Sequence, residues 1–115
     1  MMKNCLFCKI IEGEISSDKV YEDRFTFAFR DISPVAPTHI LVIPKLHISG
    51  INDINSENSD IMKHLTETAN KICVSEGIES DGFRFVINSG ENGGQTVFHL
   101  HLHIIGGRNL NWPPG

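Results

Sequence analysis

The sequence predicts an α+β fold with a mainly antiparallel sheet. Segments with strand patterns follow one another through short turns, and one long helical pattern interrupts them. Short turns favour antiparallel pairing, because a parallel pair needs a long crossover connection. The chain has 115 residues, which predicts a single domain over residues 1–115 with one hydrophobic core.

The N-terminal part combines a short helix with two strands. Apolar residues recur at helical spacing over residues 5–12, and Gly13 is placed to end this helix. Residues 19–22 and 25–30 have strand patterns, and the second segment alternates phenylalanine with smaller or polar residues. This alternation predicts a phenylalanine face that meets a core or a pocket.

The centre of the chain supplies a buried strand and the long helix. Residues 39–44 are rich in branched apolar side chains, which predicts the strand. The helix is expected over residues 57–76, with Ser56 able to cap its start and Gly77 placed to end it. Its apolar stripe is expected to consist of Ile61, Leu65, Ala69, Ile72 and Cys73.

The C-terminal part supplies the last two strands. Residues 83–87 and 97–105 have strand patterns, and the second is expected to be the longest strand of the fold. The glycine-rich segment between them, residues 89–95, predicts a loop. The tail, residues 108–115, includes Trp-Pro-Pro-Gly and is expected to be irregular.

Composition and charge exclude several classes of protein. The chain has 14 acidic and 10 basic residues and no Lys/Arg cluster, so we expect no nucleic-acid partner. Its longest apolar run, residues 40–43, is far shorter than the roughly 18 residues of a membrane helix. Residues 1–5 lack the apolar core of a signal peptide. We therefore expect a cytoplasmic protein, or in a eukaryote a cytoplasmic and nuclear one, without a membrane partner.

The three cysteines argue against a disulfide scaffold, because their number is odd and two of them are close together. Cys73 falls in an apolar helical pattern, where a buried thiol acts as a small hydrophobe. The spacing of Cys5 and Cys8 allows both thiolates to reach one tetrahedral zinc ion, or allows redox exchange. Taken alone, it is equally compatible with two small residues at the start of a helix.

The histidines are the most informative feature, because three of the six alternate at positions 99, 101 and 103. On a strand they share one face, about 6.5 to 7 Å apart, while Leu100, Leu102 and Ile104 face the core. Such an array suits zinc binding, or attack of a neutral imidazole on phosphorus. The adjoining glycine-rich loop favours phosphorus chemistry, since its backbone N–H groups can approach an anion.

The run His99-Leu100-His101-Leu102-His103-Ile104-Ile105 matches the pattern His-x-His-x-His followed by two apolar residues, which is typical of the histidine triad superfamily of nucleotidyl hydrolases and transferases. Further blocks from Cys5 to the C-terminus resemble the histidine triad nucleotide-binding protein branch, the purine nucleoside phosphoramidases. These blocks are Asp31-Ile32-Ser33-Pro34, Ala36-Pro37-Thr38-His39, Ile43-Pro44-Lys45-x-His47-Ile48-Ser49, Gly93-Gly94-Gln95, Gly106-Gly107-Arg108 and Trp112-Pro113-Pro114-Gly115.

The resemblance implies a homodimer in which each subunit has a five-stranded antiparallel sheet, one long helix and a short N-terminal helix. It also implies hydrolysis of adenosine or guanosine 5'-phosphoramidates, including aminoacyl-AMP adducts, to the nucleoside monophosphate and an amine. The reaction would pass through a covalent nucleotidyl-histidine and need no cofactor for its chemistry.

Several residues take a role from the resemblance. His101 is the nucleophile, His103 contacts the phosphate, and His39 supports His101 from behind. The residues that would bind the phosphate and leaving group are Asn88, Gly94, Gln95, Thr96 and Val97, with Thr96 also counted as catalytic where the family usually has serine. The residues that would hold the base and ribose are Phe7, Ile10, Phe29, Asp31 and Ile32, with Asp31 accepting from the ribose hydroxyls. Trp112 would lie in the tail that reaches the partner subunit's site and influences the leaving group.

Superfamily members with the Cys-x-x-Cys pair can hold a structural zinc ion. The resemblance assigns its ligands to Cys5, Cys8, His47 and His99, a closed set that leaves His101 and His103 to phosphate chemistry. Three alternatives stay open: a zinc metallohydrolase that uses the triad as ligands, a nucleotide-binding adaptor with vestigial hydrolysis, and a dinucleoside polyphosphate hydrolase. The tryptophan-containing tail disfavours the last of these.

Overall fold

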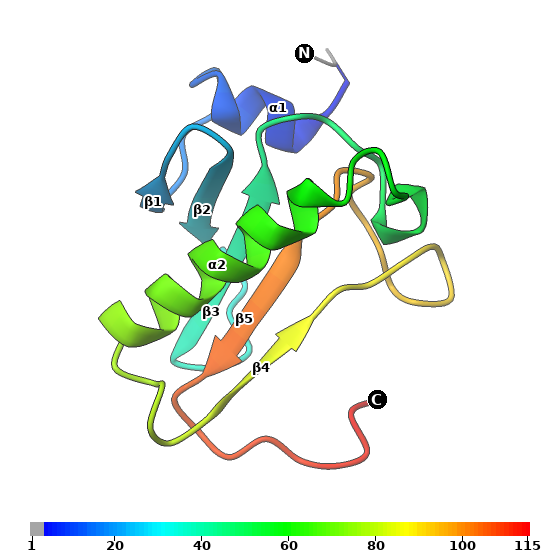
Figure 1. Ribbon diagram of the computed structural model, residues 1–115. Helices are drawn as coiled ribbons and strands as arrows, with labels where there is room; N and C mark the ends of the chain where they lie inside the picture. Colours follow the sequence, from blue (N-terminus) through cyan, green and yellow to red (C-terminus); the bar gives the residue numbers. More distant parts are fainter. Residues whose placement is uncertain (1–3) are drawn as a thin grey trace.

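The computed structural model describes residues 4–115 and contains a five-stranded antiparallel sheet with the strand order β1-β2-β3-β5-β4 (Figure 1). This confirms the predicted fold class. Residues 1–3, which the predicted domain includes, lie outside the described residues. In chain order the elements are α1 (Leu6–Ile11), β1 (Lys19–Glu22), β2 (Thr26–Arg30), β3 (Thr38–Pro44), the 3-10 turn η1 (Ile51–Asp53), α2 (Asp60–Ser75), β4 (Phe83–Val86) and β5 (Leu102–Gly106).

The sheet is covered on both faces around β2 and β3. Side chains alternate between faces along a strand, so Ala28, Ile40 and Val42 lie beneath α2, which crosses one face of the sheet (Figure 1). The opposite face is packed against α1 and carries a second apolar cluster. That cluster consists of Cys5, Phe7, Cys8, Ile10, Phe27, Phe29, Leu41 and Ile43.

The predicted phenylalanine face is confirmed in part. Phe27 and Phe29 are buried on the α1 side, but Thr26 and Ala28 between them are buried as well, because α2 covers the other side. Phe25 lies just before β2, is 44% exposed and stacks on His64 with ring centroids 3.8 Å apart. The alternation of residues along β2 therefore corresponds to two buried faces with different packing, and not to one buried and one exposed face.

The long helix starts later than predicted. It begins at Asp60 and not at residue 57, and the cap residue Ser59 makes no side-chain hydrogen bond to the helix. Asn55 Oδ1 accepts from the backbone N–H of Glu57, and Asn58 Oδ1 accepts from the N–H of Asn55, so side chains hold this segment in turns. Such local bonds compete with helix formation.

The end and the apolar stripe of the helix are confirmed. Glu76 caps the helix, and Gly77 follows it with a φ of +73°. The buried residues of the helix are Leu65, Thr68, Ala69, Ile72 and Cys73, with Ile61 partly buried. Thr68 was not in the predicted stripe, and its hydroxyl pairs with that of Thr26 at 3.0 Å beneath the helix.

The prediction that residues 97–105 form the longest strand is wrong. β5 begins at Leu102, and the longest strand is β3, with seven residues. A longer β5 would have to pair with Pro44, which has no N–H and whose carbonyl oxygen accepts from His99 Nε2 at 2.8 Å. His99 and His101 therefore precede the strand, and only His103 of the triad lies within it.

The end of α2 is tied to the sheet by an ion pair. Arg30 of β2 donates two hydrogen bonds of 2.9 Å to the Glu76 carboxylate, and the Thr38 hydroxyl donates a longer bond to it. The Arg30 guanidinium keeps the pKa of Glu76 below its ordinary value. Among residues 4–115, no helix is long and apolar enough to cross a membrane.

The ion pair predicts a pH-dependent difference in stability between the wild type and Glu76→Gln. A carboxylate with a lowered pKa stabilises the fold fully above its unfolded-state pKa, and this stabilisation disappears as the pH falls through the folded-state pKa. In denaturant unfolding, Glu76→Gln should therefore have a smaller free energy of unfolding than the wild type at pH 7, and this difference should shrink steadily below about pH 4.5. Glu67→Gln, an exposed change on the same helix, is the control. A deficit that is constant from pH 7 to pH 3 would contradict this account.

Candidate functional site

Three imidazoles meet on the α1 side of the sheet, where β3 and β5 are paired. His103 lies opposite Leu41, and His39 lies opposite Ile105, which makes His39 a diagonal neighbour of His103. The His103 ring centroid lies 5.1 Å from that of His101 and 5.2 Å from that of His39. His39 and His101 are buried, and His103 is partly buried.

The main chain decides which nitrogen of His101 can react. Nδ1 lies 2.7 Å from the carbonyl oxygen of His99, which can only accept a hydrogen bond, so the ring proton is on Nδ1. Burial lowers the pKa of His101, which favours the neutral ring. Nε2 is thereby left with a free lone pair, as a nucleophile requires.

A chain of hydrogen bonds assigns the opposite tautomer to His103. The backbone N–H of Val35 donates to His39 Nδ1 at 3.2 Å, so the proton of a neutral His39 is on Nε2. His39 Nε2 then donates to His103 Nδ1 at 2.9 Å, and the His103 proton is on Nε2. We name the Val35–His39–His103 chain the relay.

The relay ends at a polar atom without a partner. His103 Nε2 is buried and has no hydrogen-bond partner among the described residues. Burial, followed by the nearby His101 and His39, lowers the pKa of His103 to about 4, so the ring is neutral at pH 7. An unpaired buried N–H is costly, which indicates that a ligand acceptor belongs next to it.

The position of His39 corrects one expectation. The resemblance places it behind His101, but its side-chain contacts are with His103, Val35 and Asp31. The register explains the difference, since His39 is two residues from Leu41, the partner of His103. Asp31 Oδ2 lies 3.5 Å from His39 Nε2, and Asp31 Oδ1 accepts from the N–H of Ser33 at 2.8 Å.

Three of the five residues expected at the base and ribose form one apolar wall. The Phe7 ring meets the His101 ring edge-on at 5.2 Å and the Phe29 ring at 5.4 Å, and Ile10 is buried in the same cluster. Asp31 lies beside the relay, at the end of β2. Ile32 does not join this wall, because its side chain is 97% exposed.

The phosphate-side residues fall into two groups. The N–H groups of Gly94 and Gln95 donate to Glu91 and Gly90 within the loop, and the Gln95 amide bonds Gly90, Ser49 and Val97. These two residues therefore hold the loop together, and their N–H groups already have acceptors within it.

The second group remains available for a ligand. Thr96 is exposed, and the N–H groups of Thr96 and Val97 donate to no acceptor within residues 4–115. Asn88 is half-buried beyond the end of β4, and Trp112 in the tail is 81% exposed. The single chain does not bring Trp112 to the histidines.

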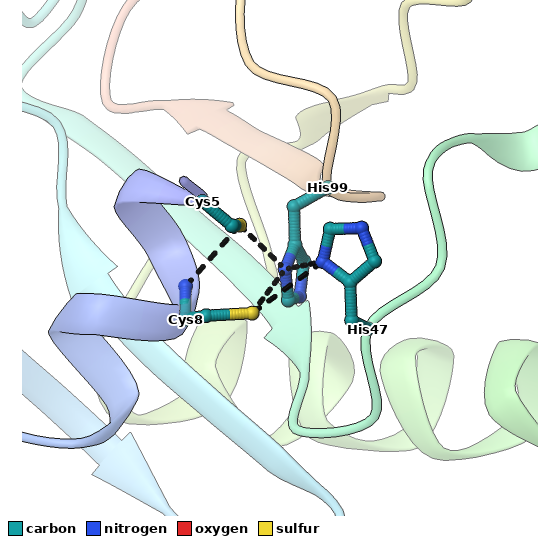
Figure 2. Close-up of side chains that lie close together, drawn as sticks. All are labelled: Cys5, Cys8, His47 and His99. Carbon is teal, nitrogen blue, oxygen red and sulfur yellow. Dashed lines mark hydrogen bonds between the residues drawn. The ribbon is translucent and has the colours of Figure 1, made fainter. Parts of the chain in front are cut away.

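A second cluster lies beside the first and contains the four predicted metal ligands (Figure 2). Its donor atoms all lie within 4.8 Å of one another. His99 Nδ1 is 3.3 Å from Cys5 Sγ, 3.6 Å from Cys8 Sγ and 3.1 Å from His47 Nδ1. Cys8 Sγ is also 3.4 Å from His47 Nδ1. Figure 2 shows the thiols on the α1 side and both imidazoles facing them.

The donor set fits a tetrahedral zinc ion. Bonds of about 2.1 Å to nitrogen and 2.3 Å to sulfur place ligands about 3.4 to 3.8 Å apart, close to the separations found here. His99 Nε2 donates to the carbonyl of Pro44 at 2.8 Å, so Nδ1 faces the cluster with a lone pair. Burial lowers the pKa of His99 to about 4, which keeps that nitrogen unprotonated at pH 7.

Two contributors to the sites are main-chain groups that sequence reasoning did not identify. The N–H of Val35 sets the tautomer of His39, and the carbonyl of Pro44 sets that of His99. No side-chain pattern reveals such groups, because every residue carries the same main-chain carbonyl and every residue type except proline carries the same N–H.

Comparisons with known proteins identify the family of the chain. A family model of the HIT domain matches residues 12–110. The purine nucleoside phosphoramidase of Escherichia coli K12 is 47% identical over 110 residues, covering 96% of this chain and 92% of that protein. The 14 kDa zinc-binding protein of Zea mays is 48% identical over 112 residues, covering 96% and 87%.

A solved structure has the same fold as this chain. The HIT family hydrolase of Legionella pneumophila superimposes with a TM-score of 0.95 and 51% identity, covering 97% of this chain and 100% of that one. These findings confirm the resemblance noted in the sequence, and the chain belongs to the HIT family.

Proposed function

We propose that this protein hydrolyses purine nucleoside 5'-phosphoramidates to a nucleoside monophosphate and an amine. The proposal rests on two atoms of neighbouring rings: His101 Nε2, which has a free lone pair, and His103 Nε2, whose N–H has no hydrogen-bond partner among the described residues. One atom is a nucleophile and the other is a donor for a phosphoryl oxygen. The relative in Escherichia coli that is named purine nucleoside phosphoramidase supports this substrate class.

The reaction has two displacements at phosphorus. In the first, His101 Nε2 attacks the α-phosphorus, the P–N bond breaks, and the leaving amine takes up a proton from the solvent. In the second, water attacks the phosphorus and releases a proton to the solvent, the bond between Nε2 and phosphorus breaks, and the monophosphate leaves with the lone pair back on Nε2. His103 Nε2–H, together with the Thr96 hydroxyl and the free N–H groups of Thr96 and Val97, would stabilise the charge on the phosphoryl oxygens.

The walls of the site suit a purine nucleoside. Phe7, Ile10 and Phe29 provide an apolar surface for the base, and the Asp31 carboxylate is placed to accept from ribose hydroxyls. Asn88 would contribute on the leaving-group side, and Ile32 would close over the base only after loop movement. The three buried, reduced cysteines agree with a cytoplasmic location.

A homodimer would complete the site. β4 is an edge of the sheet, Phe83 on it is 37% exposed, and Trp112 is 81% exposed, so each can gain contacts from a second copy. In the dimer, Trp112 would reach the partner's site and influence the choice of amine.

Zinc would be held by Cys5, Cys8, His47 and His99. With four protein ligands, the ion would act as a cross-link between α1 and the segments that carry the two histidines, with no position open for water. The zinc-binding protein of Zea mays supports this assignment.

Replacement of His101 tests the proposed nucleophile. His101→Gly should lower kcat for an adenosine phosphoramidate by about 1,000-fold or more, because the lone pair is lost. AMP affinity, measured by calorimetry, should change little, since Phe7, Phe29 and His103 remain. His64→Ala, which removes a histidine on α2, is the matched control and should keep full activity. Turnover by His101→Gly at near wild-type rates would refute the assignment.

Metal analysis tests the zinc site. The purified wild-type protein should contain about one zinc ion per chain, and Cys5→Ser or Cys8→Ser should lose it together with several degrees of Tm. Cys73→Ala removes a buried thiol on α2 and should keep the zinc. Zinc that persists in Cys8→Ser would disprove the ligand set. Immediate loss of turnover on adding a chelator, with the fold intact, would instead indicate the zinc metallohydrolase.

A substrate panel separates the remaining alternatives. We expect the largest kcat/KM for adenosine phosphoramidate and lysyl-AMP, and a much smaller value for diadenosine polyphosphates, because the site is built around one phosphate. The opposite order would indicate a dinucleoside polyphosphate hydrolase. Tight AMP binding without useful turnover of any substrate would indicate a nucleotide-binding adaptor.

A further inference from the structure

Arg108 lies two residues after the end of β5 and is not among the residues assigned to the site above. The chain there lies close to residues 31–37, because Gly106 pairs with Thr38 and Gly107 packs on Pro37. Gly107 has a φ of +89°, and a Cβ at this position would lie 2.9 Å from the Cβ of Pro37. Glycine is therefore required here, and its absence of a side chain lets Arg108 approach the 31–37 loop.

The Arg108 side chain holds the backbone of Val35. Its Nε and Nη2 atoms donate to the Val35 carbonyl at 3.0 and 2.9 Å, and Nη1 donates to the carbonyl of Asn109 at 2.9 Å. Two bonds from one planar guanidinium to one oxygen restrain both its position and its direction. A lysine cannot reproduce this geometry, because its ammonium is a point charge on a flexible stem.

Val35 is also the first member of the relay. Its N–H donates to His39 Nδ1, His39 Nε2 donates to His103 Nδ1, and the proton of His103 is left on the partnerless Nε2. We propose that Arg108 is a positioning residue, which keeps the His103 donor aimed at the phosphate by holding Val35 against His39. The catalytic meaning of this role rests on the proposed function, whereas the tautomer itself does not.

Loss of Arg108 should change the tautomers of His39 and His103, because each neutral ring can carry its proton on either of two nitrogens. Without a donor from Val35, His39 is free to carry its proton on Nδ1, and its Nε2 lone pair then faces His103 Nδ1. His103 relieves this conflict by moving its proton to Nδ1, which leaves a lone pair on Nε2 toward the phosphoryl oxygens. The Asp31 carboxylate, 3.5 Å from His39 Nε2, favours the original tautomer, so the change is partial.

The test measures the tautomer and the kinetics separately. Long-range proton–nitrogen NMR spectra of the wild type should show His103 protonated on Nε2, and Arg108→Met and Arg108→Lys should both show a mixture of tautomers. With adenosine phosphoramidate, kcat should fall about 10-fold in both variants while KM changes little, as expected for an interaction made mainly in the transition state. Arg108 is exposed, so we expect both variants to fold.

Two further variants complete the design. Arg24→Gln removes an exposed guanidinium that lies 5.2 Å from the centre of the Phe25 ring and does not touch the 31–37 loop, and it should keep the wild-type tautomer and kcat. Val35→Pro removes the N–H but keeps the carbonyl, and it should reproduce the Arg108→Met tautomer mixture. In the double variant the losses should not add, because both changes break one chain.

The outcomes distinguish the two proposals. An Arg108→Met protein with the wild-type His103 tautomer would overturn the positioning role, whether or not kcat falls. A tautomer change in Arg108→Met, found in a protein whose wild type hydrolyses no phosphoramidate, would support the positioning role and refute the proposed function.

Discussion

A neutral imidazole has one proton for two nitrogens, and the site depends on the main-chain groups that decide which nitrogen holds it. The carbonyl oxygens of His99 and Pro44 accept hydrogen bonds from His101 Nδ1–H and His99 Nε2–H, and the N–H of Val35 donates to the lone pair of His39 Nδ1. Burial keeps His99, His101 and His103 neutral. Neutrality and fixed tautomers together give similar rings different reactive atoms: a lone pair on His99 Nδ1, a lone pair on His101 Nε2 and an N–H on His103 Nε2.

His99 connects the two clusters. Its side chain faces Cys5 and Cys8, while its carbonyl oxygen anchors the ring of His101. Helix α1 also connects them, because Cys5 caps it and Cys8 lies on it beside Phe7, whose ring packs against His101. The Cys5, Cys8, His47 and His99 cluster and the His101 ring therefore depend on the same residue, His99, and on the same helix. A change in the packing of one cluster should therefore alter the other.

The two faces of the sheet have different tasks. Leu102 and Ile104 pack beneath α2 with the main apolar core, whereas His103 between them points to the site. The same short strand thus contributes to the core and to the candidate site, because consecutive side chains alternate between faces. The Arg30–Glu76 pair fastens α2 to one face of the sheet, and the histidines gather on the opposite face.

The sequence alone determined the fold class, the order of the elements and the histidine array that gathers at the candidate site, because these follow from periodicity, turn residues and the spacing of His99, His101 and His103. It did not determine the start of α2, where Asn55 and Asn58 compete with the helix, or the length of β5, which Pro44 limits. Only the tertiary structure placed His39 against His103, through the β3–β5 register. It alone revealed the roles of Val35 and Pro44, since main-chain donors and acceptors carry no residue-specific signal and act through position.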